Sequence, residues 1–163
     1  MQKLSQKYTI IQLLEDRKEG SEFSSDQWPL HVTIADVFAV NWNNNLLENL
    51  SELLAKLKPI MVTAGHDEYF GPEQQVQVTI LNMGKNLPAL HCSVIKLLKN
   101  AGAEFNEPQY IEKGFRAHAT VQLHSRLLEG DLVNFNSLSI VDMFPDNDPY
   151  RRRIIKTINL QGQ

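Results

Sequence analysis

Two short triplets of histidine and threonine are the residues of this sequence best suited to chemistry. His31 and Thr33 occur in WPLHVTIADVF, and His118 and Thr120 occur in FRAHATVQL. With five histidines and six threonines in 163 residues, about 0.2 such H-x-T triplets are expected by chance. Both triplets lie among β-branched and apolar residues, which favour strands. The repetition indicates that two histidines and two threonines meet in one pocket.

Strand geometry brings each histidine and its threonine to the same side of the chain. Side chains alternate between the faces of a strand, so residues i and i+2 share a face, with Cα atoms about 6.6 Å apart. His31 therefore projects with Thr33, while Val32 points toward the opposite, core-packing side. The same alternation pairs His118 with Thr120.

The four side chains carry the functional groups that phosphodiester cleavage requires. A neutral imidazole takes a proton from the attacking water or hydroxyl group, and an imidazolium donates one to the leaving oxygen. Both states are accessible near neutral pH, because the unperturbed pKa of histidine is about 6.5. Threonine hydroxyls donate to non-bridging phosphate oxygens and stabilise the charge that develops there. The two pairs predict a compact phosphodiester site that uses no metal.

The segments PLHVTIADVF and FRAHATVQL resemble the two signature strands of the 2H phosphoesterase superfamily, the group that contains the bacterial 2′-5′ RNA ligase-like proteins. The resemblance spans most of the chain. It implies a bilobal α+β fold with a pseudo-twofold arrangement of two antiparallel sheets, flanking helices and a central cleft. It also implies metal-free action on 2′,3′-cyclic phosphates or 2′-5′ linkages, with His31 and His118 as the acid–base pair and Thr33 and Thr120 as the phosphate ligands.

Two positions depart from the pattern of that superfamily. The usual proline before the second histidine is Ala117 here. Many members continue after the second motif with an aliphatic and then a basic residue, whereas this chain has Val121-Gln122-Leu123. The four catalytic positions are intact, so the departures concern substrate preference.

Hydrophobic patterning predicts the elements that position the motifs. One helix is expected where leucines recur from Leu46 to Leu57, capped by the preceding asparagines and stopped by Pro59. A second is expected between an N-cap at Asn86 and a C-terminal stop at Gly102. Strands are expected over 8–15, 31–38, 60–70, 75–82, 115–123, 132–144 and 151–160.

The order of these elements predicts the class of fold. It is roughly β-β-α-β-β followed by α-β-β-β, an α+β pattern in which each half carries one long helix and one H-x-T strand. An approximate internal duplication of this kind would bring the two motifs together near a pseudo-twofold axis. No linker or low-complexity tract divides the chain, so we expect one domain over residues 1–163.

Composition limits the partners and the setting of the protein. A net charge of −3 provides no global basic field for gripping long nucleic acid, which leaves a small nucleotide or an RNA terminus. The single cysteine, Cys92, excludes an internal disulfide and a cysteine-based zinc site. There is no signal-peptide pattern, and no apolar run reaches the roughly 20 residues of a membrane span. We expect a cytoplasmic monomer without membrane contact or cofactor.

The other histidines do not predict a metal site. His124 would lie about 20 Å from His118 along an extended strand, too far for one ion. His66 has acidic neighbours that could suggest a metal cluster. The acidic residue that follows it projects from the opposite strand face, so a solvated strand end is expected instead. His91 projects about 100° away from Cys92 around a helix and cannot activate its thiol. We interpret His91 and Cys92 as structural or surface residues.

Arginine and aromatic residues near the motifs are possible substrate contacts. Arg116 shares strand parity with His118, which makes it a candidate for the cleft wall. Tyr150 is a candidate to stack on a base, as are three other aromatic residues near the motif ends, Phe115, Phe38 and Trp28. The run Arg151-Arg152-Arg153 is typical of a solvated edge strand, although alternate members could border the cleft and attract an anion.

The sequence therefore favours a metal-independent phosphodiesterase that hydrolyses 2′,3′-cyclic phosphates of RNA ends or nucleotides to 2′-phosphates. The same site would act as a 2′-5′ RNA ligase with a 5′-hydroxyl nucleophile, or as a cyclic-oligonucleotide phosphodiesterase. A non-catalytic nucleotide- or RNA-binding module that retains the pocket is the rival from another class. A metallohydrolase ranks last, because no three-ligand cluster is evident. The near-equivalence of the motifs leaves open which histidine is the acid.

Overall fold

The computed structural model describes residues 5–162, which form two antiparallel sheets and two α-helices. The strands of the first sheet are β1 (Lys7–Leu13), β2 (Glu22–Ser24), β3 (His31–Ala39), β6 (Glu104–Phe105), β9 (Ser137–Asp142) and β10 (Arg151–Asn159). Those of the second are β4 (Ile60–Phe70), β5 (Val76–Asn82), β7 (His118–Thr120) and β8 (Leu132–Phe135). The helices are α1 (Asn44–Ala55) and α2 (Asn86–Asn100), with short 3₁₀ turns η1 (Pro108–Tyr110), η2 (Glu112–Gly114) and η3 (Pro145–Asn147).

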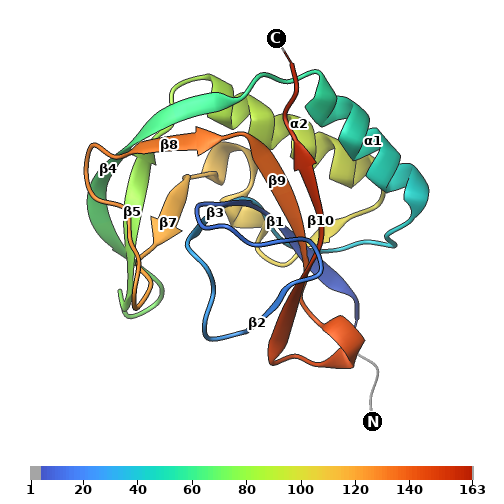
Figure 1. Cartoon of the computed structure of the whole chain (residues 1–163), viewed down its shortest axis with the longest axis horizontal. Helices are drawn as coiled ribbons and strands as arrows, with labels where there is room; N and C mark the ends of the chain where they lie inside the picture. Colours follow the sequence, from blue (N-terminus) through green and yellow to red (C-terminus); the bar gives the residue numbers. More distant parts are fainter. Residues whose placement is uncertain (1–4, 163) are drawn as a thin grey trace.

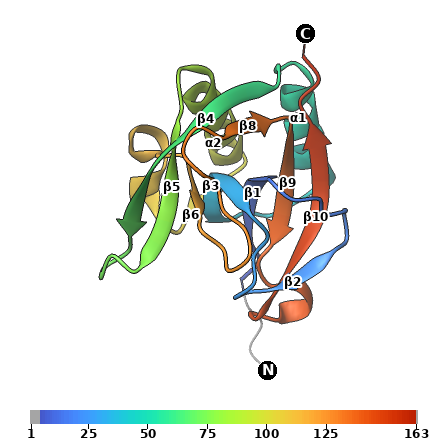
Figure 2. The ribbon, with the colours of Figure 1, turned by 60° about the vertical axis from the view of Figure 1, so that its left-hand side comes forward.

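The two sheets lie on opposite sides of the molecule, and both helices lie along one edge (Figure 1). The strand orders are β2-β10-β9-β1-β3-β6 and β7-β5-β4-β8. In the turned view of Figure 2, β4 and β5 run side by side on the left, and β9 and β10 on the right. The predicted α+β fold with two antiparallel sheets and helices is confirmed. Its strands β3 and β7, which carry the two motifs, contact each other across the boundary between the sheets.

Both helices bury leucine-rich faces, and their ends match the sequence in part. The side chain of Asn43 accepts the backbone N–H of Leu46 at 2.8 Å, so the predicted asparagine cap of α1 is confirmed. The predicted cap of α2 is wrong, because Lys85 occupies the cap position and Asn86 is already helical. Gly102 follows α2 with a left-handed φ of 87°, as a C-terminal stop requires. The buried leucines of α1 are Leu46, Leu50 and Leu54.

The chain passes from one sheet to the other at Asn136, the single residue between β8 and β9. The buried side chain of Gln12 on β1 holds this crossing: its Oε1 accepts the N–H groups of Asn136 and Ser137 at 2.9 and 3.0 Å. These bonds satisfy backbone donors at the point where the chain changes ladders. The prediction of one strand over 132–144 is therefore wrong, because its two halves belong to different sheets.

The strand predicted over 115–123 is much shorter than its apolar pattern suggests. β7 contains only His118, Ala119 and Thr120, which pair with β5. Beyond it the chain turns, and the N–H of Gln122 donates to the carbonyl of Ser125 at 2.9 Å. His124 lies exposed in this turn, so it does not share a strand face with His118.

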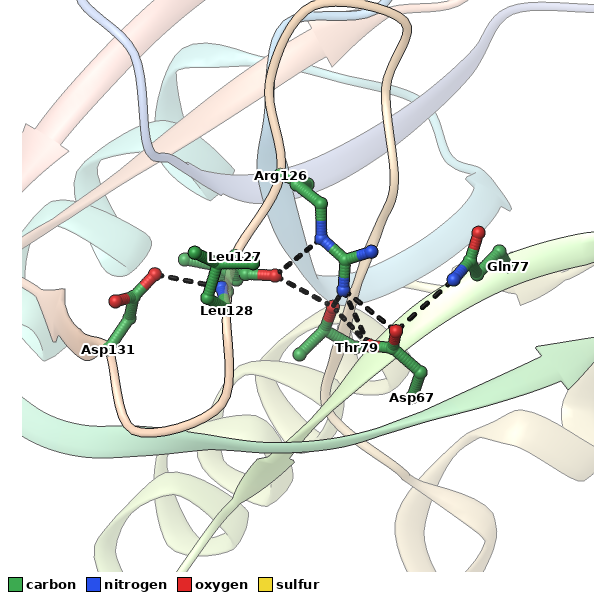
Figure 3. Close-up of polar contacts among 7 residues, drawn as sticks. All are labelled: Asp67, Gln77, Thr79, Arg126, Leu127, Leu128 and Asp131. Carbon is green, nitrogen blue, oxygen red and sulfur yellow. Dashed lines mark hydrogen bonds and ion pairs between the residues drawn. The ribbon is translucent and has the colours of Figure 1, made fainter.

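Arg126 fastens the loop between β7 and β8 (residues 121–131) to the second sheet (Figure 3). Its Nη2 lies 2.7 and 2.8 Å from the two carboxylate oxygens of Asp67 on β4, and its Nε donates to the carbonyl of Leu127 at 2.9 Å. The buried hydroxyl of Thr79 on β5 lies 3.1 Å from the same carboxylate and 3.3 Å from the Leu127 carbonyl. One guanidinium group thus joins the loop to two strands.

Replacing Arg126 with Met keeps the length of the side chain and removes its contacts to Asp67. We expect the loop to open more often, so that thermolysin cleaves before the exposed Leu123 and Leu128 roughly threefold faster or more, with an unchanged far-UV circular dichroism spectrum. Arg17→Met is the matched control, since the ion pair of Arg17 is long, 3.8 Å, and lies at the surface. Equal cleavage rates in Arg126→Met and the control would contradict this role.

Candidate active site

The two motif histidines are the first residues of β3 and β7. His31 and Thr33 are half-buried, as are His118 and Thr120. The residue between each pair is fully buried in the core, so the predicted alternation holds in both strands. Across residues 5–162, the hydroxyls of Thr33 and Thr120 have no protein hydrogen-bond partner, which leaves them able to donate to a ligand.

The backbone holds the two imidazoles in the same way. Nδ1 of His31 lies 2.8 Å from the carbonyl of Pro29, and Nδ1 of His118 lies 2.7 Å from the carbonyl of Arg116. A carbonyl oxygen only accepts hydrogen bonds, so Nδ1 carries the hydrogen in both rings. The lone pair of each neutral imidazole is then on Nε2, which is the atom available for proton transfer.

An aromatic ring and an arginine lie beside His118. The ring of Phe70 on β4 packs edge-on against the imidazole with centroids 4.8 Å apart, and the Arg116 guanidinium lies 5.5 Å from the centre of the Phe70 ring. Arg116 also makes two hydrogen bonds to Glu68, at 2.7 and 3.1 Å. The predicted wall residue Arg116 therefore lies beside His118, with its charge largely compensated by Glu68.

A comparable arrangement lies beside His31. The ring of Trp28 is 5.0 Å from the imidazole, and the Arg152 guanidinium lies 5.9 Å from the centre of the Trp28 ring. Nη1 of Arg152 donates to three backbone carbonyls, the first of which belongs to Met143 at 2.7 Å. Each motif imidazole therefore packs on an aromatic ring that also contacts an arginine, although the two arginines come from unrelated parts of the chain.

The arginine run does not form a solvated edge strand. It lies in β10, which pairs with β2 on one side and with β9 on the other. Arg151 and Arg153 form ion pairs with Glu22 of β2, and only Arg152 points toward Trp28. The prediction of an edge strand is wrong here because the short β2 covers these three residues, a pairing that local patterning does not reveal.

The surroundings of the two imidazoles oppose their protonation. Burial lowers the pKa of His31 and of His118 below the ordinary value of 6.5. The positive charge of His118 lowers the pKa of His31 further. Nearby carboxylates act in the opposite direction, Glu15 on His31 and Asp36 on His118, without reversing the effect of burial.

A cavity of about 530 Å³ opens beside His118. Thr33 and His118, one residue from each H-x-T pair, line it, whereas His31 and Thr120 do not. Its other walls come from β3, from the β4–β5 turn and from the segment 108–116 that precedes β7. Three aromatic residues, Phe70, Tyr110 and Phe115, and the polar residues Asp36, Gln109 and Arg116 form much of its surface. Its volume lies within the range of small-molecule sites.

A β-bulge in β3 turns Asp36 toward this cavity. Against β1, the register of β3 slips twice, so that extra residues of β3 lie between Thr33 and Phe38. The alternation breaks as a result: Ile34 and Ala35 are both buried in the core, and Asp36 is half-buried at the cavity. Bulges re-aim side chains next to functional sites in this way.

Buried side chains satisfy the backbone at the bulge. The hydroxyl of Thr9 donates to the Ala35 carbonyl at 2.8 Å, and Nδ1 of His91 on α2 donates to the Ile34 carbonyl at 2.6 Å. Nε2 of His91 accepts the N–H of Glu112 at 2.9 Å. With both nitrogens engaged in this way, the fully buried imidazole is neutral, and burial lowers its pKa. The structural interpretation of His91 is the one this geometry supports.

The segment 108–116 forms the cavity wall as a compact turn. The ring of Phe115 stacks on His91 with centroids 3.9 Å apart and planes within 4°. Glu112 adopts a left-handed φ of 59° and forms an ion pair with Lys99 of α2. A Cβ atom at Gly114 would lie 1.8 Å from the carbonyl oxygen of Gln109, so only glycine fits there. These contacts fix the wall to α2.

The four aromatic residues predicted as possible substrate contacts lie in different surroundings. Trp28 packs against His31 and Phe115 lines the cavity, whereas Phe38 is fully buried in the core. Tyr150 is 74% exposed and does not line the cavity, so its predicted role stays a prediction. Sequence reasoning missed Asp36 and Phe70, although an aspartate within the apolar run HVTIADVF is a signal that could have pointed to the first.

Residues 5–162 contain neither a metal-binding cluster of side chains nor a membrane-spanning helix. Among residues 5–162, no group of three or more histidine, cysteine, aspartate or glutamate side chains is placed to hold a metal ion. In the same part of the chain, no helix has the length and apolar character needed to cross a membrane.

Solved structures of other proteins resemble this one, although the sequence alone finds no match. No protein-family model and no curated protein matches the sequence. The structure matches that of Escherichia coli LigT in complex with NADP⁺, with a TM-score of 0.56 and 13% identity over 99% of this chain and all of LigT. The chain has the LigT fold. A structure described as a phosphoesterase matches with a TM-score of 0.59 and 13% identity over 98% of this chain and all of that protein.

A third match extends the comparison with LigT. The protein TT0787 of Thermus thermophilus has a TM-score of 0.53 and 16% identity over 82% of this chain and 79% of its own. At 13–16% identity, these structural matches establish the fold alone. The resemblance drawn from two nine- to ten-residue segments is thereby confirmed for the architecture of nearly the whole chain.

The neutral state of His91 predicts a pH-dependent stability. A histidine whose pKa is lower in the folded state contributes stability above its ordinary pKa of about 6.5, and the contribution is lost as the pH falls. We expect the free energy of unfolding, measured with urea, to decrease between pH 7.5 and pH 5.5. His91→Leu leaves the carbonyl of Ile34 and the N–H of Glu112 without their partner, so it should cost about 1–3 kcal/mol at pH 7.5 and reduce this pH dependence.

His31 and His118 contribute to the same acid destabilisation, so the variant should reduce the slope without abolishing it. His124→Leu, at an exposed position, is the matched control. A pH dependence in His91→Leu as steep as that of the wild type would contradict a neutral, doubly bonded imidazole at this position.

Proposed function

We propose that the protein is a metal-independent phosphodiesterase that hydrolyses 2′,3′-cyclic phosphates of nucleotides or RNA ends to 2′-phosphates. His31 and His118 act as general base and general acid, and Thr33 and Thr120 bind the phosphate oxygens. This is the activity expected from the H-x-T pairs, and the LigT fold is compatible with it.

The matched hydrogen bonding of the two imidazoles is the observation that carries the proposal. Both rings donate through Nδ1 to a backbone carbonyl, which fixes the ring and leaves Nε2 for a substrate. A structural histidine in this protein looks different, because His91 engages both nitrogens. Each motif histidine also has a threonine two residues away whose hydroxyl has no protein partner in residues 5–162.

The reaction balances with these groups alone. Nε2 of one neutral imidazole removes a proton from water as the water oxygen bonds to phosphorus. The bond between phosphorus and the 3′-oxygen breaks, and the other histidine, as an imidazolium, protonates that oxygen. The product keeps its phosphate on the 2′-oxygen. Hydroxyls of Thr33 and Thr120 donate to the non-bridging oxygens, where negative charge increases in the transition state.

The charge of the site supports small substrates. Arg116 is paired with Glu68, and Arg151 and Arg153 are paired with Glu22, so these arginines have little charge left to hold a long polyanion. LigT structures contain NADP⁺, 3′-AMP and ATP, which are small nucleotides rather than long nucleic acids. We extend this ligand class to the present chain as part of the proposal.

Turnover of the four 2′,3′-cyclic nucleotides in excess EDTA tests the proposal. We expect wild-type hydrolysis to 2′-phosphates, identified by phosphorus NMR, and a loss of kcat of about 10²- to 10⁴-fold in His31→Ala and in His118→Ala. His124→Ala is the matched control, because His124 is exposed in the loop 121–131 and should retain wild-type turnover.

The other outcomes are equally informative. Wild-type turnover that survives both histidine substitutions would overturn the mechanism. Tight binding of the nucleotides without turnover at any pH would replace the proposal with a nucleotide-binding module. Loss of activity in EDTA that added metal restores would replace it with metal-dependent hydrolysis.

Burial of the two histidines predicts the pH at which the activity is highest. The pH dependence of kcat/KM reports the base and the acid of the free enzyme, so activity rises through the pKa of the base and falls through that of the acid. Burial lowers both pKa values, which moves the expected maximum from neutrality to below about pH 6.5. A bell-shaped profile of kcat/KM centred above pH 7 would contradict this assignment.

A further inference from the structure

In the two-histidine reaction, the carboxylate of Asp36 acts only by opposing the lowering of the pKa of His118, yet the fold presents it inside the cavity that Thr33 and His118 line. It lies on the same strand as Thr33, three residues farther along. Because of the bulge, Asp36 lies closer to Thr33 than the roughly 10 Å that three residues of regular strand span. Thr33, Asp36 and His118 line one cavity, so Asp36 can meet a base whose phosphate lies at Thr33 and His118.

The protein maintains this placement at some structural cost. Without the bulge, alternation from His31 and Thr33 would bring Ala35 rather than Asp36 to the cavity face. The bulge requires Thr9 and His91 to satisfy the carbonyls of Ala35 and Ile34 in the core. The carboxylate is itself anchored, because Oδ1 accepts the N–H of Val37 at 2.9 Å. Neither oxygen binds an arginine or a lysine in residues 5–162.

The surroundings of Asp36 suit a flat ring. Phe70 and Phe115 are half-buried walls of the cavity, and the ring of Tyr110, 57% exposed, lies at its surface. Stacking on aromatic side chains holds a base of any type, so it supplies affinity without discrimination. Within this aromatic enclosure, the anionic group of Asp36 distinguishes bases by the donors they carry on their edges.

We propose, building on the proposed function, that Asp36 selects guanine, so that guanosine 2′,3′-cyclic phosphate or an RNA end terminating in it is the preferred substrate. Guanine carries two adjacent donors, N1–H and the 2-amino group, which match the two oxygens of a carboxylate. Adenine and cytosine offer one amino group beside an acceptor nitrogen. Uracil offers one N–H between two carbonyl groups, and the carboxylate repels the oxygens of these carbonyl groups.

Relative kcat/KM values for the guanosine, adenosine, cytidine and uridine 2′,3′-cyclic phosphates test this selectivity. All four carry the same reacting group, so their ratios report on the base. We expect wild type to prefer the guanosine compound by about 5- to 100-fold, the discrimination that a bidentate pair provides. The inosine compound, which lacks the 2-amino group, should fall between guanosine and adenosine.

Asp36→Asn replaces one carboxylate oxygen with an NH₂ donor and keeps an oxygen that can accept the Val37 N–H. We expect it to lower kcat/KM for the guanosine compound to the level of the adenosine compound, while turnover of the adenosine compound changes little by comparison. Asp142→Asn is the matched control: Asp142 is also half-buried and accepts one backbone N–H, from Phe144 at 2.9 Å, but it does not line the cavity.

The outcomes separate this inference from the proposed function. Turnover of all four nucleotides at similar kcat/KM would overturn guanine selection and leave the phosphodiesterase intact. A guanine preference that persists in Asp36→Asn would overturn the role of Asp36. If no nucleotide is turned over, the phosphodiesterase proposal fails, and calorimetric Kd values for 2′-GMP and 2′-AMP decide the selectivity: equal values in wild type overturn it, and tighter 2′-GMP binding that Asp36→Asn abolishes supports it.

Discussion

The hydrogen bond from the buried imidazole of His91 to the carbonyl of Ile34 is the contact on which the cavity depends. On one side it satisfies a backbone acceptor at the β3 bulge. On the other, the same ring accepts the N–H of Glu112 and stacks on Phe115. A buried carbonyl without a partner would cost about 1–3 kcal/mol. One neutral side chain thus fixes both the irregular strand and the opposite wall, and its neutrality is part of the architecture.

The imidazoles of His31 and His118 share one local hydrogen-bond arrangement and differ in their surroundings. Each donates through Nδ1 to the carbonyl two residues earlier, so the chain segment that leads into each strand sets the ring. The large cavity, however, lies beside His118, while Trp28 packs on His31 with Arg152 beside it. The two near-identical motifs therefore have different surroundings. Under the proposed function, one half of the site would bind the body of a substrate while both halves act on its phosphate.

Features of the site that depend on neighbouring residues could be predicted from the sequence, and those that depend on distant contacts could not. The shared face of His31 and Thr33 follows from strand alternation, and the cap at Asn43 from local side-chain chemistry. Asp36 escaped prediction because the bulge that exposes it is held by Thr9 and His91, which lie far away in the sequence. Likewise, no local pattern shows that 132–144 changes sheets at Asn136, since Gln12 holds that crossing.

The position of β9 within the first sheet has a consequence for folding of the protein during its synthesis on the ribosome. β1 lies between β3 and β9, and β2 pairs only with β10, so N-terminal strands obtain partners from residues 137–159. The second sheet also needs β8, at 132–135, to complete its order. Neither sheet can be completed until residues 132–159 have been synthesised, which delays burial of apolar β1 residues such as Ile10 and Ile11. The growing chain thus exposes an incomplete hydrophobic sheet until β9 and β10 pair with it.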